Sequence, residues 1–276
     1  MRYERPETAK EAAGLLANEK GQAFLLAGGT DLLVKLKMGM VEPDLVVDIK
    51  HMAKANEIQA TARGFSIGAG VPGARLGEHK ALTKAWPGVV EAANLIGSDQ
   101  IQGRCTLAGN LCNASPAADS VPAMIAAGAK AVIVGPKGRR SVAVEKVPTG
   151  PGQTCLAKGE LIESISLPKP APRTGDAYLR FIPRTEMDIA VVGVAICVTL
   201  ERGVIKKARV ALGAVAPTAV LVPAAARPRT MPPSTAVPAS QVTPATSGKA
   251  GPPARSGAAI NAATVMKTHV NRLGLI

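Results

Sequence analysis

Leu26-Ala27-Gly28-Gly29-Thr30-Asp31-Leu32 connects a short apolar run, residues 24–27, to a segment with helical spacing, residues 31–37. Paired glycines let backbone N–H groups approach an anion closely, and the N-terminus of the following helix adds a positive dipole. Thr30 can cap that helix and offer its hydroxyl to a phosphate. The spacing matches neither G-x-G-x-x-G nor a Walker loop, so neither a Rossmann fold nor a P-loop is indicated. An ordinary strand-to-helix turn has the same pattern, and the stretch alone leaves both interpretations open.

Helical and strand patterns alternate around this loop. Residues 8–19 have the apolar spacing of an amphipathic helix, and residues 45–49 form a second apolar run. A strand–loop–helix–strand unit favours parallel strands. Further strands are expected at residues 65–69, 130–135 and 161–167, helices at 77–84, 87–96 and 121–127, and a Gly- and Asn-rich loop at 103–119.

The C-terminal part of the chain changes character twice. Three prolines in residues 168–172 predict an extended linker, after which strands are expected at 177–181, 190–200 and 208–215. Residues 227–255 hold seven prolines in 29 residues, so no helix runs through them. Such a segment is either disordered or wrapped over a neighbour. We hypothesise that it is frame-shifted sequence, natural or erroneous.

A second loop of small residues is Thr106-Leu107-Ala108-Gly109-Asn110. Leu111-Cys112-Asn113-Ala114-Ser115-Pro116-Ala117-Ala118-Asp119 continues it with polar side chains spaced for several hydrogen bonds. Two loops of this kind in one domain can hold both phosphates of a dinucleotide. The combination is therefore far more specific than either loop alone.

These two loops, together with Ile96-Gly97-Ser98 and Arg184-Thr185-Glu186-Met187-Asp188-Ile189-Ala190, carry a resemblance that covers about residues 1–222. The chain resembles the FAD-binding medium subunit of the xanthine dehydrogenase / carbon monoxide dehydrogenase family of molybdenum hydroxylases. The resemblance implies an α+β fold: a two-lobed FAD-binding domain of the vanillyl-alcohol-oxidase (PCMH) type, followed by a smaller α+β domain. The expected boundaries are residues 1–170, with lobes of about 1–54 and 55–170, and residues 173–276.

The resemblance also implies a set of cofactor-binding residues. The first loop would wrap the pyrophosphate, and the second would contact the pyrophosphate and the ribityl side of FAD. Asn113 and Asp119 would hydrogen-bond the flavin, Leu161 or Ile162 would pack near its ring, and Arg180 would stand near the ring. Cys105 takes a position that is usually small and is expected to be redox-sensitive. The full set is Leu26, Ala27, Gly28, Gly29, Thr30, Asp31, Leu32, Ile101, Cys105, Thr106, Gly109, Asn110, Asn113, Ala118, Asp119, Leu161, Ile162 and Arg180.

The function that the resemblance implies is electron relay. A large molybdopterin subunit would hydroxylate the substrate, and two [2Fe–2S] clusters in a small subunit would pass single electrons to FAD in this chain. The chain would then reduce an external acceptor, with the chemistry supplied by the cofactor and no residue acting as a general acid or base. The loops contain no histidine, so FAD is expected to be noncovalent. A dimer of heterotrimers is the expected assembly.

The net charge of the chain at first suggests a function other than electron transfer. The 276 residues carry a net charge of +13, which suggests nucleic acid or an anionic membrane. Residues 1–201, however, hold 23 basic and 20 acidic residues, and residues 202–276 hold the other 10 basic residues and no Asp or Glu. Aromatic residues are few and scattered, which disfavours nucleic-acid binding. The basic excess thus belongs to the C-terminal end and is a poor guide to partners.

Cysteine spacing and hydropathy set further limits. Cys105, Cys112, Cys155 and Cys197 form no C-x-x-C pair, so no metal site is expected in this chain. The sequence shows no signal peptide and no apolar run long enough for a membrane helix, and a cytoplasmic protein without membrane insertion is expected.

Two other functions stay open at this point. One is a stand-alone flavin reductase or oxidase of the same fold, of the UDP-N-acetylenolpyruvoylglucosamine reductase type, which would need its own substrate pocket with an acid. The other is a basic binding module that uses residues 202–276.

Overall fold

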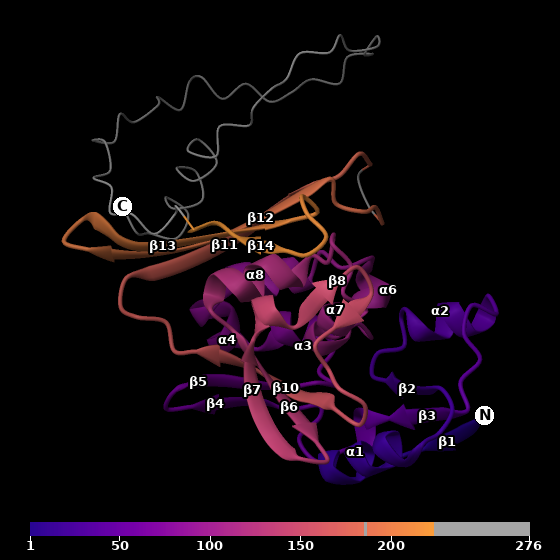
Figure 1. Cartoon of the computed structure of the whole chain (residues 1–276). Helices are drawn as coiled ribbons and strands as arrows, with labels where there is room; N and C mark the ends of the chain where they lie inside the picture. The colour runs from indigo at the N-terminus through magenta and orange to yellow at the C-terminus, as the bar shows by residue number, and fades with distance from the viewer. Residues whose placement is uncertain (185–186, 224–276) are drawn as a thin grey trace, which may run out of the picture.

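The computed structural model describes residues 1–184 and 187–223, which form three main β-sheets with helices packed between and around them (Figure 1). The predicted irregular segment at residues 227–255 lies outside the described residues. None of the helices in the described part of the chain combines the length and the apolar character that crossing a membrane requires.

The first sheet is parallel and comes from the N-terminal residues. Its strand order is β1 (Arg2–Glu4), β3 (Leu45–Asp48) and β2 (Ala23–Leu26). Helix α1 (Ala9–Asn18) begins at Thr8, whose hydroxyl accepts a hydrogen bond from the Glu11 N–H at 3.1 Å, as its N-cap position requires. Helix α2 (Leu32–Lys37) follows the first glycine loop, and the short helix η1 (Ile49–His51) follows β3. The predicted parallel pairing is confirmed.

The second sheet is antiparallel, with the order β4 (Ile58–Thr61), β5 (Gly64–Gly68), β10 (Leu161–Pro168), β6 (Lys130–Gly135) and β7 (Gly138–Ala143). Between β7 and β10 lie the helix η2 (Val144–Lys146) and the small pair β8 (Pro148–Gly150) and β9 (Gln153–Thr154). The chain between β5 and β6 holds six helices: α3 (Gly73–Glu78), α4 (Lys80–Ala85), α5 (Pro87–Ala93), α6 (Asp99–Gln102), α7 (Leu107–Asn113) and α8 (Ser120–Ala127).

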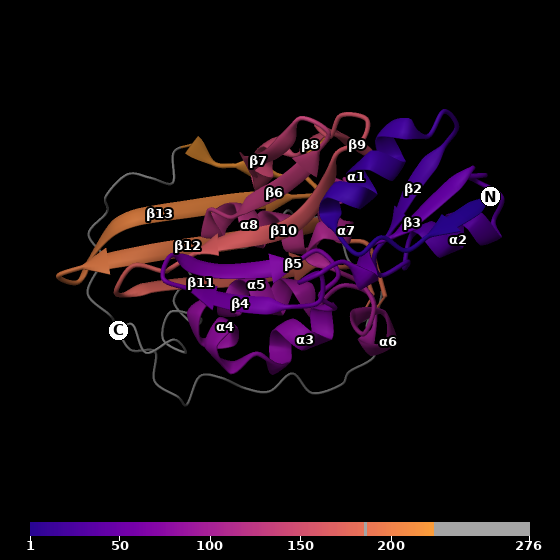
Figure 2. The ribbon, with the colours of Figure 1, turned by 90° about the horizontal axis from the view of Figure 1, so that it is seen from below.

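Helix α8 is the centre of the molecule. Every one of its residues is buried, because it contacts β10 of the second sheet on one side and β12 and β13 of the third sheet on the other (Figures 1 and 2). A helix that is apolar on all sides must be covered by other elements on all sides. It therefore fixes the distance between the two sheets.

Two sequence-based predictions are wrong in this region. The single helix expected at 77–84 is two helices, because the backbone leaves helical geometry at His79, whose ring Nδ1 accepts a hydrogen bond from the Leu82 N–H at 3.1 Å. The loop expected at 103–119 contains α7, which burial of Leu107 and Leu111 stabilises despite the glycine and asparagine between them. Helix α7 ends at Ala114, which has a positive φ of 49°.

The third sheet is antiparallel and follows the proline linker. It consists of β11 (Thr174–Phe181), β12 (Val192–Glu201), β13 (Val204–Gly213) and β14 (Val220–Leu221), so the three longer strands predicted here are confirmed. Side chains of alternate residues share one face of a strand. On the face that covers α5 and α8, Asp176, Cys197 and Arg209 form one cross-strand row.

Asp176 joins the third sheet to the rest of the molecule. Its side chain is 4% exposed, and its Oδ2 accepts a hydrogen bond from the Val89 N–H at 3.1 Å, at the start of α5. Oδ1 has no partner among the described residues. Burial raises the pKa of Asp176 to about 7, and the nearby Glu91 adds to the rise, while the N–H groups of Gly88 and Val89 oppose it. The carboxyl group is therefore neutral over part of the physiological pH range.

The Asp176→Asn variant tests this assignment. A folded-state pKa above the unfolded value means that the folded chain binds more protons, so stability falls as pH rises towards 7 and then levels off. Asparagine is neutral at every pH, so the stability of the variant relative to the wild type should rise by about 3 kcal/mol between pH 5 and pH 8. Urea unfolding at the two pH values measures the gain, with the exposed Glu42→Gln as control. An equal difference at both pH values would rule the assignment out.

Candidate functional site

The two glycine loops lie directly against each other. A Cβ atom on Gly28 would stand 1.9 Å from the carbonyl oxygen of Arg104 and 3.2 Å from Cys105 Cα, so only glycine fits there. The second loop is held in turn by α3, because the Gly73 N–H donates to the Cys105 carbonyl at 2.8 Å. The loops therefore form one continuous surface, in which Asp31 of the first loop is hydrogen-bonded to Asn113 of the second although the two residues are 82 positions apart in the sequence.

The first loop presents unpaired hydrogen-bond donors. Within the described residues, the backbone N–H groups of Gly28, Gly29, Thr30 and Asp31 donate no hydrogen bond. Gly29 has a φ of +79°, a left-handed conformation that lets consecutive N–H groups point to one side. Four adjacent unsatisfied donors fit the oxygens of a phosphate, and a pyrophosphate matches the hydrogen-bonding capacity of this loop.

A partly buried ion pair at the end of β3, in which the Asp48 side chain is 3% and the Lys50 side chain 32% exposed, supports the first loop. The Lys50 ammonium group donates to the Ala27 carbonyl at 3.2 Å and pairs with Asp48 at 2.7 Å. Burial alone would raise the pKa of Asp48, but hydrogen bonds from Lys50 and the Tyr3 hydroxyl outweigh it and hold this pKa below its usual range. The carboxylate therefore stays charged at neutral pH. The end of β3 thus fixes the point where β2 enters the loop.

The second loop is built around α7. The Thr106 hydroxyl accepts from the Gly109 N–H at 2.9 Å and caps the helix. Asn110 Oδ1 accepts from the Ser120 hydroxyl at 2.6 Å, which ties α7 to the start of α8. Asn113 Nδ2 donates to Asp31 at 3.2 Å, and Lys35 Nζ donates to Asn113 Oδ1 at 3.3 Å. Asn113 therefore bridges the two loops.

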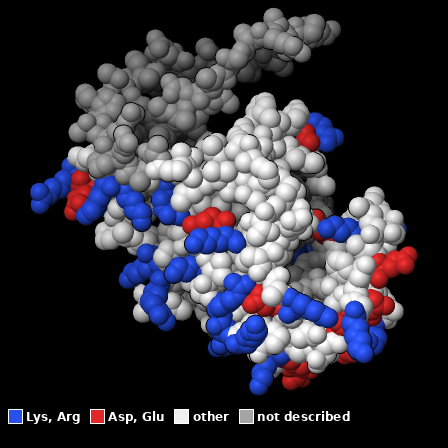
Figure 3. All heavy atoms as spheres, viewed as in Figure 1, with Lys and Arg blue, Asp and Glu red and all other residues white. Residues whose placement is uncertain are grey.

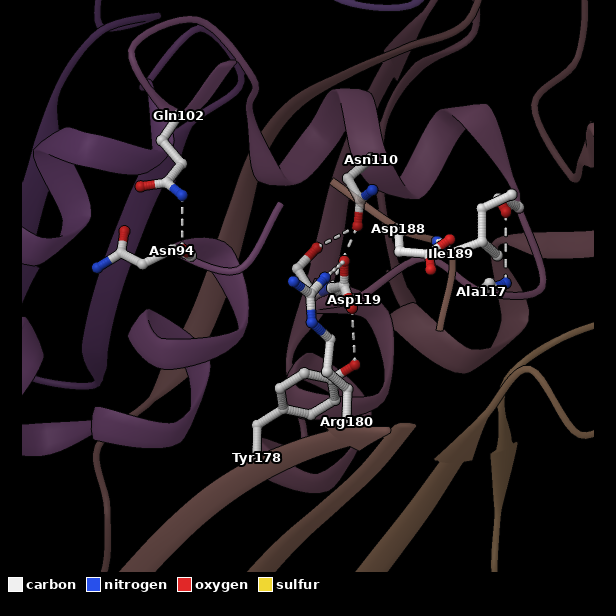
Figure 4. A network of polar contacts seen from close by, with 11 residues as sticks. Asn94, Gln102, Asn110, Ala117, Asp119, Tyr178, Arg180, Asp188 and Ile189 are labelled. Atoms are coloured by element: carbon white, nitrogen blue, oxygen red, sulfur yellow. Dashed lines mark hydrogen bonds and ion pairs between the residues drawn. The ribbon is translucent and has the colours of Figure 1, made fainter. Parts of the chain in front are cut away.

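The third sheet adds two side chains next to the second loop. The Tyr178 hydroxyl and the Arg180 guanidinium each donate to one oxygen of Asp119, both at 3.0 Å (Figure 4). The Asp119 and Arg180 side chains are 12% and 8% exposed. Burial raises the pKa of Asp119, although Arg180 and Tyr178 act in the opposite direction. Figure 4 shows Asn110, Asp119, Tyr178 and Arg180 converging on one place.

The remaining predicted residues lie at varied depths. Ile101 on α6 is half-buried beside Gly97, and Ala118 is buried. Leu161 and Ile162 are 0% and 3% exposed in the core of the second sheet, so in this structure their side chains pack within the protein. Burial raises the pKa of the Cys105 thiol to about 11, which keeps it protonated at neutral pH. A buried, protonated thiol disfavours the redox sensitivity expected of Cys105.

Four residues of the site were absent from the sequence-based set: Lys35, Lys50, Ser120 and Tyr178. The sequence could have indicated Tyr178, because it stands two positions before Arg180 in a predicted strand and therefore lies on the same face as Arg180. Lys50 had a weaker one, since it stands two residues after the acidic end of a strand. Lys35 and Ser120 had none, because their partners belong to segments that only the folded chain brings near.

Comparison with known proteins agrees with this geometry. Residues 1–170 match the model of the FAD binding domain in molybdopterin dehydrogenase, and residues 177–228 match that of the CO dehydrogenase flavoprotein C-terminal domain. The chain belongs to the FAD-binding medium subunits of the molybdenum hydroxylases. The family predicted from the loop motifs is thus confirmed, as is the α+β fold with its C-terminal domain.

Individual relatives of this flavoprotein subunit are similar over most of their length. The xanthine dehydrogenase FAD-binding subunit of Escherichia coli O157:H7 is 33% identical over 220 residues, which cover 79% of this chain and 75% of the relative. The carbon monoxide dehydrogenase medium chain of Hydrogenophaga pseudoflava is 32% identical over 218 residues, covering 79% and 76%. A solved structure of carbon monoxide dehydrogenase from that organism matches with a TM-score of 0.76 over 80% of this chain and 77% of its own.

The Gly28→Ala variant tests the contact between the loops. The added methyl group would overlap the Arg104 carbonyl, so the loops must separate, and we expect at least about tenfold weaker FAD binding, equivalent to about 1.4 kcal/mol. Flavin absorbance per folded chain, with folding checked by circular dichroism, measures the effect.

Gly14→Ala in α1 is the matched control for this variant. A Cβ at Gly14 meets no atom within 4 Å, and alanine in a helix is more stable than glycine by roughly 0.5–1 kcal/mol. The control should keep its flavin and melt at a slightly higher temperature. A folded Gly28→Ala chain with wild-type flavin content would refute the role of the contact.

Proposed function

We propose that this chain is the FAD-carrying electron-transfer subunit of a molybdenum hydroxylase, which takes electrons from the [2Fe–2S] clusters of a partner subunit and passes them to an external acceptor. The observation that carries the proposal is the surface of unpaired N–H groups where the two loops meet, in a chain of this family. FAD, when bound, supplies the electron chemistry, because it accepts electrons singly and releases them in pairs.

The chain's own residues bind and orient the cofactor in this proposal. The N–H groups of residues 28–31 hold the pyrophosphate, with Thr106, Gly109 and Asn110 on the pyrophosphate and ribityl side. Asn113 and Asp119 hydrogen-bond the flavin, with Arg180 near its ring. Leu161 or Ile162 is also expected beside the ring, but both side chains are buried in the second sheet, which does not support that contact. No histidine stands in either loop, which supports noncovalent binding.

The partners follow from the kind of complex that the relatives form. Medium chains of carbon monoxide dehydrogenase belong to multi-subunit assemblies, and we propose a small iron–sulfur subunit and a large molybdopterin subunit, arranged as a dimer of heterotrimers, for this chain. Relatives named for xanthine, carbon monoxide and caffeine dehydrogenases are all 31–33% identical to it. Such different substrates beside similar medium chains support a substrate site in another subunit.

The domain boundaries are part of the proposal. We divide the chain at the proline linker into a FAD-binding domain, residues 1–170, and a C-terminal domain from residue 173 onward. The two family models, which end at residue 170 and begin at residue 177, support this division.

Rapid mixing of the flavin-loaded chain with a reduced iron–sulfur subunit tests the function. The small subunit is reduced with dithionite and freed of excess reductant, and bleaching of flavin absorbance is followed in time. We expect bleaching only when that subunit is present. Turnover of a substrate by the chain alone, with no partner subunit, would instead identify a stand-alone flavin enzyme.

Variants of the Arg180–Asp119 pair test the position of the ring. A positive charge near the ring stabilises the negative charge that FAD gains on reduction, so Arg180→Ala should lower the midpoint potential. Asp119→Asn should raise it, because it leaves Arg180 without its counter-charge. Each single change should move the potential by about 30 mV or more, which for a two-electron couple is about 1.4 kcal/mol. The double variant should lie close to the wild type.

Lys206 and Glu201 form an ion pair at 2.6 Å at the other end of the third sheet, with side chains 61% and 57% exposed. Lys206→Ala and Glu201→Gln should leave the midpoint potential unchanged, since these charges are screened by solvent and remote from the site. Potentials are measured by spectroelectrochemical titration of the bound flavin. If the two Arg180–Asp119 single variants shift the potential in the same direction, the ring does not lie beside this pair.

A further inference from the structure

A groove of about 960 Å³ opens at one end of the third sheet, away from the loops. Its walls are the proline linker with the start of β11, the C-terminal end of α8, and the β12–β13 hairpin. The hairpin turn, Arg202-Gly203, has positive φ angles of 51° and 79° at both residues, the geometry of a tight hairpin turn. The groove is thus bounded by a rigid strand pair on one side and a proline-stiffened segment on the other.

The walls of this groove are strongly basic. One acidic side chain, that of Glu201, lies in these walls. The six basic side chains are Lys169, Arg173, Arg202, Lys206, Lys207 and Arg209. Figure 3 shows Lys and Arg side chains gathered along the left flank of the molecule, where the linker and the β12–β13 hairpin lie. The lone carboxylate is already engaged, because Glu201 pairs with Lys206 at 2.6 Å.

Of the other cations, one has a structural task and four do not. Arg209 donates to the carbonyl groups of Ile125 at 2.7 Å and Ala126 at 3.1 Å, which satisfies the end of α8. The four others are exposed, and within residues 1–184 and 187–223 they form no ion pair with a carboxylate: Lys169, Arg173, Arg202 and Lys207.

The rest of the chain offers little to neutralise these four charges. Residues 202–276 contain no Asp or Glu at all, and Glu186 is the single acidic residue outside the described ranges. Asp176, the cross-strand neighbour of the lining residue Cys197, is also close to the groove. It is buried and accepts a hydrogen bond from α5, so it does not pair with these cations. No carboxylate of the described residues therefore competes with an acidic partner for these four cations.

The groove is separate from the FAD site, although residues on the same face of β11 line both. Thr174 in the groove and Arg180 in the site lie six residues apart on β11, which spans about 20 Å in an extended strand. A molecule in the groove would therefore leave the loops open.

We infer that this groove binds an acidic segment of a partner polypeptide. The four unpaired cations are spread over the linker, the hairpin turn and β13, which suits a linear chain of carboxylates better than one compact anion. Apolar lining residues of the linker such as Pro170 and Ala171, which are half-buried and exposed, give its aliphatic parts a contact surface. Nucleic acid fits less well: the one aromatic in the lining, Trp86, is 3% exposed and donates its indole N–H to the Pro168 carbonyl at 2.9 Å, so no base can stack on it.

Binding of a fluorescein-labelled polyglutamate peptide to the flavin-loaded full chain, followed by fluorescence anisotropy at about 0.15 M salt, tests the inference. The groove variant combines Lys169→Gln, Arg173→Gln, Arg202→Gln and Lys207→Gln. The control combines Lys10→Gln, Lys20→Gln, Lys137→Gln and Lys158→Gln, four exposed residues that do not line the groove. We expect the groove variant to bind the peptide at least about tenfold more weakly than the wild type and the control to stay within about twofold.

Three results would overturn the inference: equal loss in both variants, no peptide binding by the wild type, or tighter binding of oligothymidylate than of polyglutamate. Circular dichroism and flavin content are measured on every variant. A groove variant that misfolds is replaced by the double change Lys169→Gln and Lys207→Gln, for which about threefold weaker binding is expected. Flavin content reports on the proposed function independently, because none of these residues belongs to the FAD site.

Discussion

The contact of Gly28 with the Arg104 carbonyl is the constraint on which the site depends, since it brings together segments that are far apart in the sequence. With no side chain in between, the first loop can lie against the backbone that leads into α7. That closeness puts Asn113 within reach of Asp31 and Lys35, and it sets four unpaired N–H groups beside the capped start of α7. A side chain at residue 28 would separate two surfaces that bind one cofactor together.

A second organising element is the inner face of the third sheet. Side chains on that face of β11 alternate with those on the outer face, so Asp176 reaches α5, while Tyr178 and Arg180 reach Asp119. One strand thereby fastens the sheet to the FAD-binding domain and completes the polar cluster beside the second loop. Its other end borders the basic groove. The strand holds these places at fixed spacing, because each of its residues pairs with β12.

The distribution of charge gains a structural meaning from this arrangement. As a number, +13 suggests an anionic partner, and its concentration in residues 202–276 makes it a poor guide. In the fold, three residues of the β12–β13 hairpin, Arg202, Lys206 and Lys207, come together with Lys169 and Arg173 of the linker around one groove. Local charge density at a concave surface, rather than net charge, is what steers and selects a partner.

Features of the fold and the site could be predicted from the sequence when they depend on residues close together in the chain, and not when they depend on contacts between distant residues. The strand–loop–helix unit, the strands of the third sheet and the family followed from local patterns and motifs, because the spacing of apolar residues and glycines is written into short segments. The break at His79 and the helix α7 were missed, since capping by a ring nitrogen and burial of Leu107 and Leu111 override the local preference. The hydrogen-bond partners of Asn113, which are Asp31 and Lys35, could not be inferred, because no local pattern links residues so far apart in the sequence.

The sequence by itself determined that two glycine loops exist, that a flavoprotein family uses them, and that the basic residues outnumber the acidic ones at the C-terminal end. Only the tertiary structure decided that Gly28 touches Arg104, that Tyr178 and Arg180 share Asp119, and that six cations of two separate segments line one groove. The physical reason is that these contacts join residues from about 30 to nearly 80 positions apart. Such contacts depend on how sheets and helices pack, which no local pattern records.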